Sequence, residues 1–410
     1  MEQADAAAPQ PQDLQAAQAF IASSYGCTLG AGWISLEEAQ GRILAEDVVA
    51  ASALPRFAAS AMDGFAIRDA DLADGCPAML RIAGTARAGH PFPRPLEPGQ
   101  AVRIFTGAPV PAGADRVIMQ EDCRIGSGVV TLETAALRKR HIRHPGEDVR
   151  EGQLLLPKGT RITAAHQSLL AALQIERVRL VRPLKVALLS TGDELRPLGQ
   201  PLGAGQIVDT NGPYLRRHLL QHGCRVDNRG IIPDDADALM ETLVSAAADN
   251  DFVLTTGGAS VGAEDHLKQL VRKRGYLEFW RLRMKPGKPV GLGDVDDCPI
   301  LILPGNPVAA AVAFHFLGQV LIAALSGDRV RVPSSLRLSL AAPAAKTTDR
   351  LEILAARLVA VAGGVPAVDI LPVQGSASHL SLALAEGWAQ IPAGGAAHRS
   401  GFVDYFPIGF

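Results

Sequence analysis

The sequence predicts a multi-domain protein in which a central, mostly parallel α/β unit is combined with β-rich units. Its 410 residues exceed what one ordinary hydrophobic core holds, so two to four domains are expected. Between Leu184 and Leu325, strand-like apolar runs alternate with helix-length segments, which is typical of a parallel sheet covered by helices. From Met79 to about Leu155, and again from Arg331 to Phe410, short apolar runs lie between Gly, Pro and Asp clusters, as in small all-β units.

The first fifty residues are expected to form a small helical or mixed part. Residues 1–12 are rich in Ala, Gln and Pro and predict a disordered tail. Asp13 is placed to cap a helix that reaches Ser24. Ser35-Leu36-Glu37-Glu38 has the S-x-x-E form of a capping box and predicts a short helix running towards Leu44.

The same part resumes after the first β-rich stretch, with a helix at Thr163–Leu173 and a strand at Arg177–Leu180. Pro183 is a plausible linker to the α/β unit. We therefore expect, by residue number, a disordered tail (1–12), an N-terminal helical/mixed domain (13–50 and 150–183), a β-rich inserted domain (51–149), the α/β domain (184–330) and a C-terminal β-domain (331–410).

The α/β unit is predicted in more detail. Its expected strands are Lys185–Leu189, Arg225–Ile231, Phe252–Thr255 and Ile300–Leu303. Its expected helices are Asn211–His222, Ala236–Ala248, Glu264–Gly275 and Val308–Leu325.

Composition excludes several classes of function. The net charge of -2 gives no electrostatic footprint of a nucleic-acid binder, although Arg138–His144 is a local basic run that suits a solvated loop or an anion-attracting rim. We find no stretch of about 18 apolar residues and no signal peptide, so no membrane span is expected. Five scattered cysteines without a CxxC pair argue against disulfides and zinc, and a cytoplasmic location fits.

Glycines or carboxylates follow each expected strand of the α/β unit, where open sheets of this kind bind ligands. The segments concerned are Ser190–Leu195, Pro233–Asp235, Thr255–Gly262 leading to Glu264-Asp265, and Pro304–Pro307. Glycines let backbone N–H groups approach an anion, and carboxylates suit a hard cation such as Mg²⁺. Lys285 and Lys288, on a turn stiffened by prolines, suit a phosphate or another oxyanion.

Each of these features also has a purely structural interpretation. Gly257-Gly258 can be a tight turn, and Asp234-Asp235 can be an N-cap. Lys285 and Lys288 can be solvated, and Pro304–Pro307 can be a rigid connection. The functional interpretation is favoured because acidic and basic groups converge on one edge of the predicted sheet.

Further motifs complete a pattern that resembles a known family. They are Ser60–Ala66 around Asp63, Thr106–Pro111, Gly146–Asp148, Ser190–Leu195, Asp209–Asn211, Lys285–Pro289 and Leu303–Pro307. In this order they resemble the motifs of the MoeA proteins (molybdopterin molybdotransferases) and of the E-domain of gephyrin, from about Leu14 to the C-terminus. Composition alone does not make the three motifs of the first half a site.

The resemblance implies a fold and an assembly. It implies an elongated, four-part subunit whose α/β domain is molybdopterin-binding-like and catalytic. It also implies a homodimer with a shared active site, in which the β-rich insertion of one subunit faces the α/β unit of the other. The molybdopterin adenylyltransferase is a further candidate partner.

The resemblance also implies a reaction, in which molybdate is inserted into adenylyl-molybdopterin with release of AMP and with Mg²⁺ as cofactor. The implied catalytic residues are Asp63, Thr106, Asp148, Glu194, Asp234, Asp265 and Lys285. Glu194, Asp234 and Asp265 are the candidate metal ligands. The implied substrate-binding residues are Thr191, Gly192, Asp209, Asn211, Gly257, Gly258, Ser260, Arg281, Lys288, Pro304, Gly305, Asn306 and Pro307. Arg281 stands where relatives often carry lysine, which keeps the charge and changes the donor geometry.

Two other functions compete with this one. The first is a different enzyme on the same fold, either the molybdopterin adenylyltransferase or a related nucleotide hydrolase, which would not need the insertion that carries Asp63 and Thr106. The second is a non-catalytic scaffold, which would not need Glu194, Asp234 and Lys285.

Overall fold

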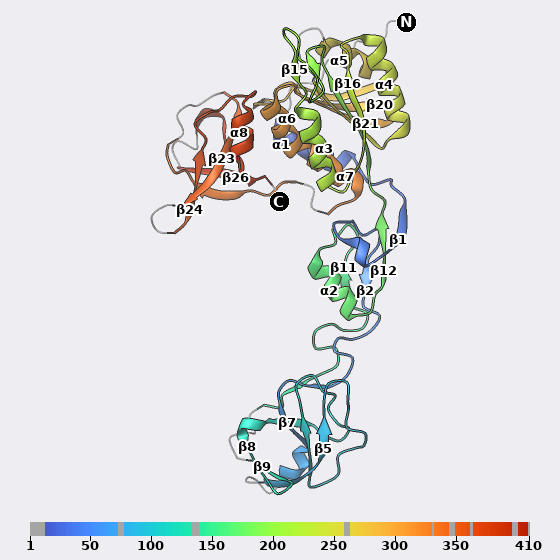
Figure 1. The fold of residues 1–410 in the computed structure, drawn as a ribbon, viewed down its shortest axis with the longest axis vertical. Helices are drawn as coiled ribbons and strands as arrows, with labels where there is room; N and C mark the ends of the chain where they lie inside the picture. Colours follow the sequence, from blue (N-terminus) through green and yellow to red (C-terminus); the bar gives the residue numbers. More distant parts are fainter. Residues whose placement is uncertain are drawn as a thin grey trace.

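The molecule is elongated and consists of four parts (Figure 1). The computed structural model describes residues 13–72, 78–132, 139–257, 263–329, 332–343, 349–360, 364–395 and 401–408, so the expected disordered tail lies outside it. The α/β unit and a C-terminal unit lie side by side at one end. A stalk leads from the α/β unit to a distal lobe at the other end.

A six-stranded sheet forms the centre of the α/β unit, in the order β16-β13-β17-β21-β20-β18. The first four strands are parallel, and the last two run antiparallel to their neighbours. The strands are β13 (Lys185–Thr191), β16 (Arg225–Ile232), β17 (Phe252–Gly257), β18 (Gly275–Trp280), β20 (Gly291–Val295) and β21 (Cys298–Leu303). The predicted α/β class and its four parallel strands are confirmed, whereas the antiparallel edge was not predicted.

Helices cover both faces of this sheet. They are α3 (Asn211–Gln221), α4 (Ala236–Asp249), α5 (Ala263–Arg274), α6 (Pro307–Ala313), the π-helical turn η5 (Phe314–Gly318) and α7 (Gln319–Ser326). One hydrophobic core contains residues of α3, α6 and α7, and a second contains residues of α4 and α5. The sheet is therefore buried on both sides, which explains why its strands are continuous apolar runs.

The first helix, α1 (Leu14–Ser24), is capped by Asp13 as predicted, since the Asp13 carboxylate accepts a hydrogen bond from the Ala16 N–H at 2.7 Å. We expected this helix in the N-terminal mixed domain. Instead, Leu14 and Ile21 are buried in the core of the α/β unit, and α1 packs against α7. Burial of these two side chains stabilises the protein by roughly 3–6 kcal/mol. This gain explains why α1 packs on the α/β unit and not on the segment that follows it in the sequence.

The segment Pro307–Ser326 corrects the expectation that no long apolar stretch exists. It is a 20-residue helix that is apolar enough, by length and composition, to cross a membrane. Its most apolar window is 94% buried within the molecule, between the sheet and α1. Apolar character all round the helix is thus explained by its position in the core.

The stalk is built from paired strands and one helix. They are β1 (Ala31–Ser35), β2 (Val48–Val49), β11 (Leu154–Leu156), α2 (Ala164–Ala172) and β12 (Arg177–Val181). The helix predicted from Ser35 towards Leu44 is wrong, because only one 3-10 turn forms, at Glu37–Ala39. The Ser35 hydroxyl does donate to Glu38, but Gly41, with φ of +73°, interrupts the helical pattern directly afterwards.

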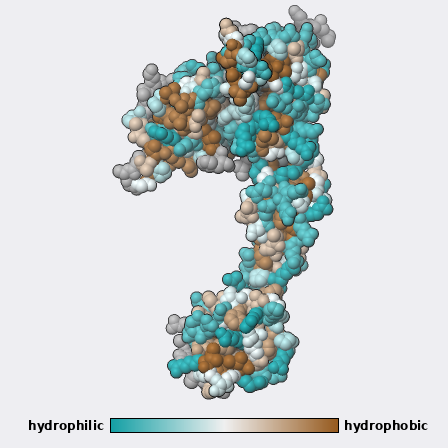
Figure 2. Space-filling model, in the orientation of Figure 1, coloured by the Kyte–Doolittle hydropathy of each residue, from teal (hydrophilic) through white to brown (hydrophobic). Residues whose placement is uncertain are grey.

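The distal lobe has a six-stranded sheet in the order β7-β4-β6-β5-β9-β8. Its strands are β4 (Gly64–Ile67), β5 (Ala78–Ala86), β6 (Gln100–Ile104), β7 (Arg116–Met119), β8 (Cys123–Gly126) and β9 (Val129–Leu132). The paired strands β3 (Ala59–Ser60) and β10 (Ile142–Arg143) join it to the stalk. The lobe and the stalk have hydrophobic cores of their own, and the surface of the stalk between the larger parts is mostly hydrophilic (Figure 2).

The C-terminal unit is built around a β-sheet, as predicted, and also contains a short helix that was not predicted. It contains β22 (Leu336–Ser339), β23 (Leu351–Ala360), β24 (Pro366–Ile370), α8 (His379–Leu384), β25 (Gly387–Ile391) and β26 (Phe402–Pro407). One strand of this sheet comes from the α/β part of the chain, because β19 (Met284–Lys285) pairs in parallel with β23. The turn that carries Lys285 is therefore held by the C-terminal unit.

Candidate functional site

The carboxyl ends of the parallel strands are tied together by a buried amide. The Asn211 side chain, at the first turn of α3, donates to Thr256 Oγ1 at 2.8 Å and to the Gly305 carbonyl at 2.7 Å. Thr256, at the end of β17, donates in turn to the carbonyl of Pro304 at 3.1 Å. Asn211 thus fixes the strand ends β17 and β21 relative to α3.

Asp209 links the end of β13 to the same helix. Its carboxylate accepts a hydrogen bond from the Ser190 hydroxyl at 2.7 Å and another from the Gly212 N–H at 2.9 Å. A Cβ atom at residue 212 would lie 2.5 Å from Asp209 Oδ2, so only glycine fits there. The predicted residues Asp209 and Asn211 therefore hold the frame of the site.

A cavity of about 690 Å³ opens at this edge of the sheet. It brings together eleven of the predicted residues, namely Thr191, Gly192, Glu194, Asp209, Asn211, Asp234, Gly257, Pro304, Gly305, Asn306 and Pro307. The hydroxyl of Thr191 is buried there without a hydrogen-bond partner in the described part of the chain. It is a donor available to a ligand.

Two glycines shape the floor of this cavity. Gly257 has a φ of +99°, and a Cβ atom there would lie 2.0 Å from the carbonyl oxygen of Thr191. Gly192 has a φ of +148°, and its missing Cβ leaves space for the carboxylate of Glu194, whose Oε2 would lie 2.5 Å from that Cβ. The backbone angles favour glycine at both positions, and the contact with Thr191 excludes a side chain at Gly257. Gly257 thus forms a tight turn and also lines the cavity.

The two acidic residues before α4 have different roles. Asp235 is an N-cap, since its carboxylate accepts hydrogen bonds from the N–H groups of Asp237 and Ala238. Asp234 lines the cavity, and its Oδ1 is buried without a hydrogen-bond partner among the described residues. Burial, followed by the negative charge of Asp193, raises the pKa of Asp234 above that of an ordinary aspartate, and Glu194 adds to this.

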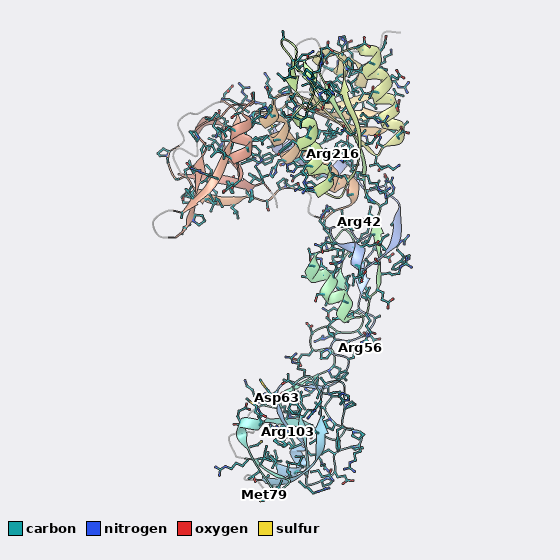
Figure 3. The ribbon with its side chains drawn as sticks, in the orientation of Figure 1. Arg42, Arg56, Asp63, Met79, Arg103 and Arg216 are labelled. Carbon is teal, nitrogen blue, oxygen red and sulfur yellow. The ribbon has the colours of Figure 1, made fainter. Side chains whose placement is uncertain are left out.

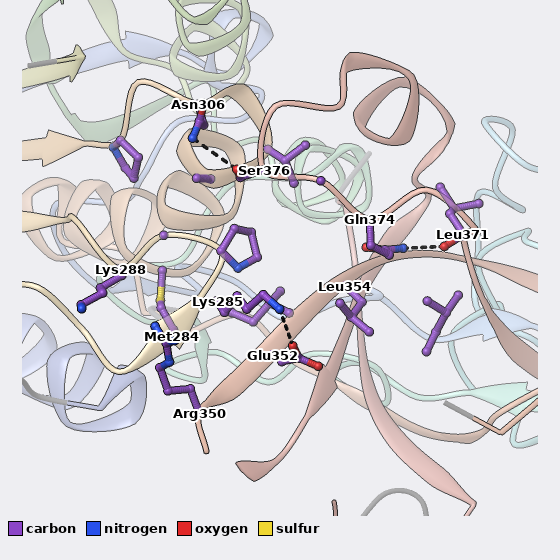
Figure 4. A pocket seen from close by; sticks show the side chains of 18 of the residues that line it. Met284, Lys285, Lys288, Asn306, Arg350, Glu352, Leu354, Leu371, Gln374 and Ser376 are labelled. Carbon is purple, nitrogen blue, oxygen red and sulfur yellow. Dashed lines mark hydrogen bonds and ion pairs between the residues drawn. The ribbon is translucent and has the colours of Figure 1, made fainter. Parts of the chain in front are cut away.

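A second cavity, of about 600 Å³, lies between the α/β and C-terminal units (Figure 4). Lys285 and Lys288 line it, whereas we expected them beside Glu194. The Lys285 ammonium is 3.0 Å from the carboxylate of Glu352, a largely buried residue of β23. The two cavities share Pro289, Pro304 and Asn306 in their linings, so they are neighbours.

Some predicted residues are not placed in either cavity. Arg281 is in neither lining and adopts a φ of +75°. Gly258, Ser260 and the side chain of Asp265 lie outside the described residues. Within the described residues no group of three His, Cys, Asp or Glu side chains is arranged to hold a metal ion.

None of the three predicted residues of the first half lines either cavity, and Asp63 lies in the distal lobe, at the opposite end of the subunit from the α/β unit (Figure 3). In the distal lobe, Asp63 Oδ1 accepts hydrogen bonds from the N–H and the hydroxyl of Thr106, both at 2.8 Å. These bonds lower the pKa of Asp63, and the charge of Arg103 contributes. Asp148 lies in a shallow hollow with Gly146 and Arg150, near the joint between lobe and stalk.

Sequence reasoning missed the contribution of the C-terminal unit. Glu352, Arg350, Gln374 and Ser376 line the second cavity, and Ser376 accepts a hydrogen bond from the Asn306 amide at 3.2 Å. One signal was available, because Glu352 is a charged residue within the apolar strand β23. Buried charges of this kind are paired or functional.

The fold defines a multi-domain α/β protein with a cavity beyond the carboxyl ends of a parallel sheet, the place where sheets of this kind bind ligands. Residues 12–173 match the family model of the MoeA N-terminal region (domain I and II), and residues 187–324 match the model of a probable molybdopterin binding domain. Together these models cover more than half of the chain.

Relatives and solved structures agree with the family models. The chain is 41% identical to the molybdopterin molybdenumtransferase of Haemophilus influenzae over 298 residues, 72% of this chain and 73% of the relative. It is 38% identical to that of a Nostoc species over 301 residues, 72% of this chain and 69% of the relative. A crystal structure of a MoeA protein from Pyrococcus horikoshii superposes with a TM-score of 0.81 at 25% identity, covering 97% of this chain and 98% of that one.

The chain belongs to the MoeA family of molybdopterin molybdenumtransferases. It is accordingly a transferase of molybdenum cofactor biosynthesis.

Proposed function

We propose that the protein inserts molybdenum from molybdate into adenylyl-molybdopterin and releases AMP, at the edge of the sheet in the α/β unit. One observation carries the proposal. The cavity that collects Glu194, Asp209, Asp234 and the glycine turns at Gly192 and Gly257 adjoins a second cavity that contains lysines. A nucleotide-like ester and a small oxyanion can therefore bind side by side.

The residues of the first cavity suit the adenylyl-molybdopterin. The turns at Gly192 and Gly257 let the backbone approach its phosphates closely. The unpartnered Thr191 hydroxyl donates to a phosphate oxygen. In the second cavity, Lys285 and Lys288 supply point charges for the tetrahedral molybdate, with Glu352 fixing the position of Lys285.

Asp234 and its neighbours fit a bound Mg²⁺. The Asp234 carboxylate has a buried oxygen without a hydrogen-bond partner among the described residues. The negative charges of Asp193 and Glu194 lie nearby, so a cation would stabilise this group of carboxylates. Asp234 and Glu194 would hold the ion, since Mg²⁺ in proteins is commonly bound by one or two carboxylates together with substrate phosphates. When bound, Mg²⁺ would neutralise phosphate oxygens of the substrate.

The reaction needs no protein nucleophile. Glu194 lies over Gly192, where its carboxylate faces the substrate phosphates, and Asn211 keeps the surrounding turns in place. A molybdate oxygen attacks the pterin-side phosphorus, the phosphoanhydride bond breaks and AMP leaves with the bridging oxygen. The two dithiolene sulfurs of the pterin then displace two oxygens from molybdenum, of which one stays on the pterin phosphate and the other leaves as water. Asp63 and Thr106 then act from the distal lobe of a second subunit in a homodimer, with Asp148 at the joint between that lobe and its stalk, because the distal lobe is remote from the α/β unit of its own subunit (Figure 3).

A direct assay tests the proposed reaction against its closest rival. Purified protein incubated with adenylyl-molybdopterin, molybdate and Mg²⁺ is expected to release AMP and to yield pterin-bound molybdenum, measured by chromatography and metal analysis. Incubation with molybdopterin and ATP is expected to give no adenylyl-molybdopterin. Adenylylation in the second reaction, without AMP release in the first, would show that the adenylyltransferase reading is the correct one.

The pH dependence of AMP release is expected to depend on Mg²⁺. Because the pKa of Asp234 is raised, its carboxylate takes up a proton at a higher pH than an exposed aspartate does. Protons and metal compete for the same carboxylate, so raising the Mg²⁺ concentration should move the acid limb of the pH–rate profile to lower pH. A limb that stays at the same pH over a tenfold range of Mg²⁺ would rule out Asp234 as a ligand.

A further inference from the structure

Two arginines in the distal lobe are held over the same aromatic ring. The guanidinium carbons of Arg87 and Arg103 lie 5.5 Å and 5.4 Å from the ring centroid of Phe105. Both arginines are exposed, and Phe105 is half-buried. Stacking on an aromatic face restricts a guanidinium without using its N–H donors, so the pair is preorganised to bind an anion.

The pair adjoins the corner formed by Asp63 and Thr106. Thr106 follows Phe105 directly, and the charge of Arg103 is near enough to lower the pKa of Asp63. In the part of the chain that the structure describes, neither Arg87 nor Arg103 forms an ion pair with a carboxylate. Among the described residues, neither guanidinium is therefore neutralised by a carboxylate in direct contact with it.

The cavity at the sheet edge, in contrast, has a lining of net negative charge. Its described lining contains the carboxylates of Glu194, Asp209 and Asp234, and it contains neither lysine nor arginine. A phosphate-bearing ligand bound there meets negative charge on the protein side. One bound divalent cation offsets only part of it, so further positive charge must approach from outside the cavity.

We propose that Arg87 and Arg103 bind a phosphate of the substrate that occupies the cavity of a second copy of this chain. The proposal rests on the proposed function and extends it to two residues that the sequence pattern did not indicate. The contact must be made between copies, because the Arg103 side of the lobe and the α/β unit lie at opposite ends of one subunit (Figure 3). The charge of the pair complements the acidic lining of the cavity.

The first test compares the R87Q R103Q double variant with wild type, once wild type has been shown to release AMP. The KM for adenylyl-molybdopterin is expected to rise about 10-fold to 100-fold, the range expected when charge-assisted hydrogen bonds are lost. The R87K R103K variant, which keeps the charge without the planar donor fork, is expected to fall between the two. The matched control is R94Q, since Arg94 stacks on Phe92 at 5.6 Å in the same lobe.

The second test locates the arginines relative to the cavity that they serve. A chain with R87Q and R103Q and a chain with E194Q are co-expressed with different tags, and the mixed dimers are purified. Activity is measured at an adenylyl-molybdopterin concentration well below the KM of the arginine variant. Contact between copies leaves one of the two sites without any lesion, so about half of the wild-type activity is expected. Mixed dimers whose activity at that concentration is only the mean of the two parents, or a double variant with the KM of wild type, would overturn the proposal, whereas an inactive wild type would overturn the proposed function itself.

Discussion

Replacing Glu194 by Gln is expected to lower kcat/KM for AMP release by about 100-fold or more, which corresponds to roughly 2.7 kcal/mol of transition-state stabilisation. Gln has the size of Glu without its charge, so the neighbouring turn at Gly192 should keep its conformation. The loss arises because the proposed cation, which offsets the charge of the substrate phosphates, loses a negatively charged ligand. Steady-state AMP release at saturating Mg²⁺ measures the effect.

The fold should be unaffected by this change. Glu194 is exposed and makes no side-chain hydrogen bond that the fold depends on, so the melting temperature of E194Q should match that of wild type. E241Q, on the exposed side of α4, is the control for removing one acidic charge from the same domain. If E194Q kept wild-type turnover, Glu194 would have no part in the reaction.

Replacing Gly257 by Ala is expected to destabilise the protein by roughly 2–5 kcal/mol and to abolish activity. The new Cβ would lie 2.0 Å from the carbonyl oxygen of Thr191, in a residue whose φ of +99° already disfavours a side chain. Relief of this clash must separate β13 from β17, which are paired at these two residues. Thermal or denaturant unfolding followed by circular dichroism gives the loss of stability.

A second glycine of the same sheet separates the two causes of this loss. Gly230 in β16 has a φ of +77°, but a Cβ there meets nothing within 4 Å. G230A should therefore show only the cost of the backbone conformation, about 1 kcal/mol, and should keep its activity. Equal destabilisation of G230A and G257A would mean that the close approach of Thr191 has no energetic importance.

The sequence was sufficient to predict the parallel strands and the helices of the α/β unit, because the local hydrophobic pattern and the tertiary structure agree there. Continuous apolar runs became buried parallel strands, and the glycines and acids after them met at one edge, as the rule for open sheets requires. For Asp234 and Asp235 the sequence left two interpretations open, a metal-binding carboxylate or a helix N-cap. Which of the two carboxylates caps α4 depends on backbone angles that residue type does not determine.

Contacts between distant segments could not be predicted in the same way. Nothing in the sequence of α1 says that Leu14 and Ile21 pack on α7, about 300 residues later. The pairing of Lys285 with Glu352 depends on the parallel pairing of β19 with β23, which no periodicity indicates. The structure therefore brings the predicted strand-end residues together in one cavity and places the two lysines in the neighbouring cavity.

The pairing of β19 with β23 also has a mechanical consequence. A ligand seated among Lys285, Asn306 and Ser376 touches both bodies that meet there, and its binding energy opposes their separation. An oxyanion bound in this cavity would thus hold the α/β and C-terminal units together. It would also restrict the movement of the residues that this cavity shares with the cavity at the sheet edge.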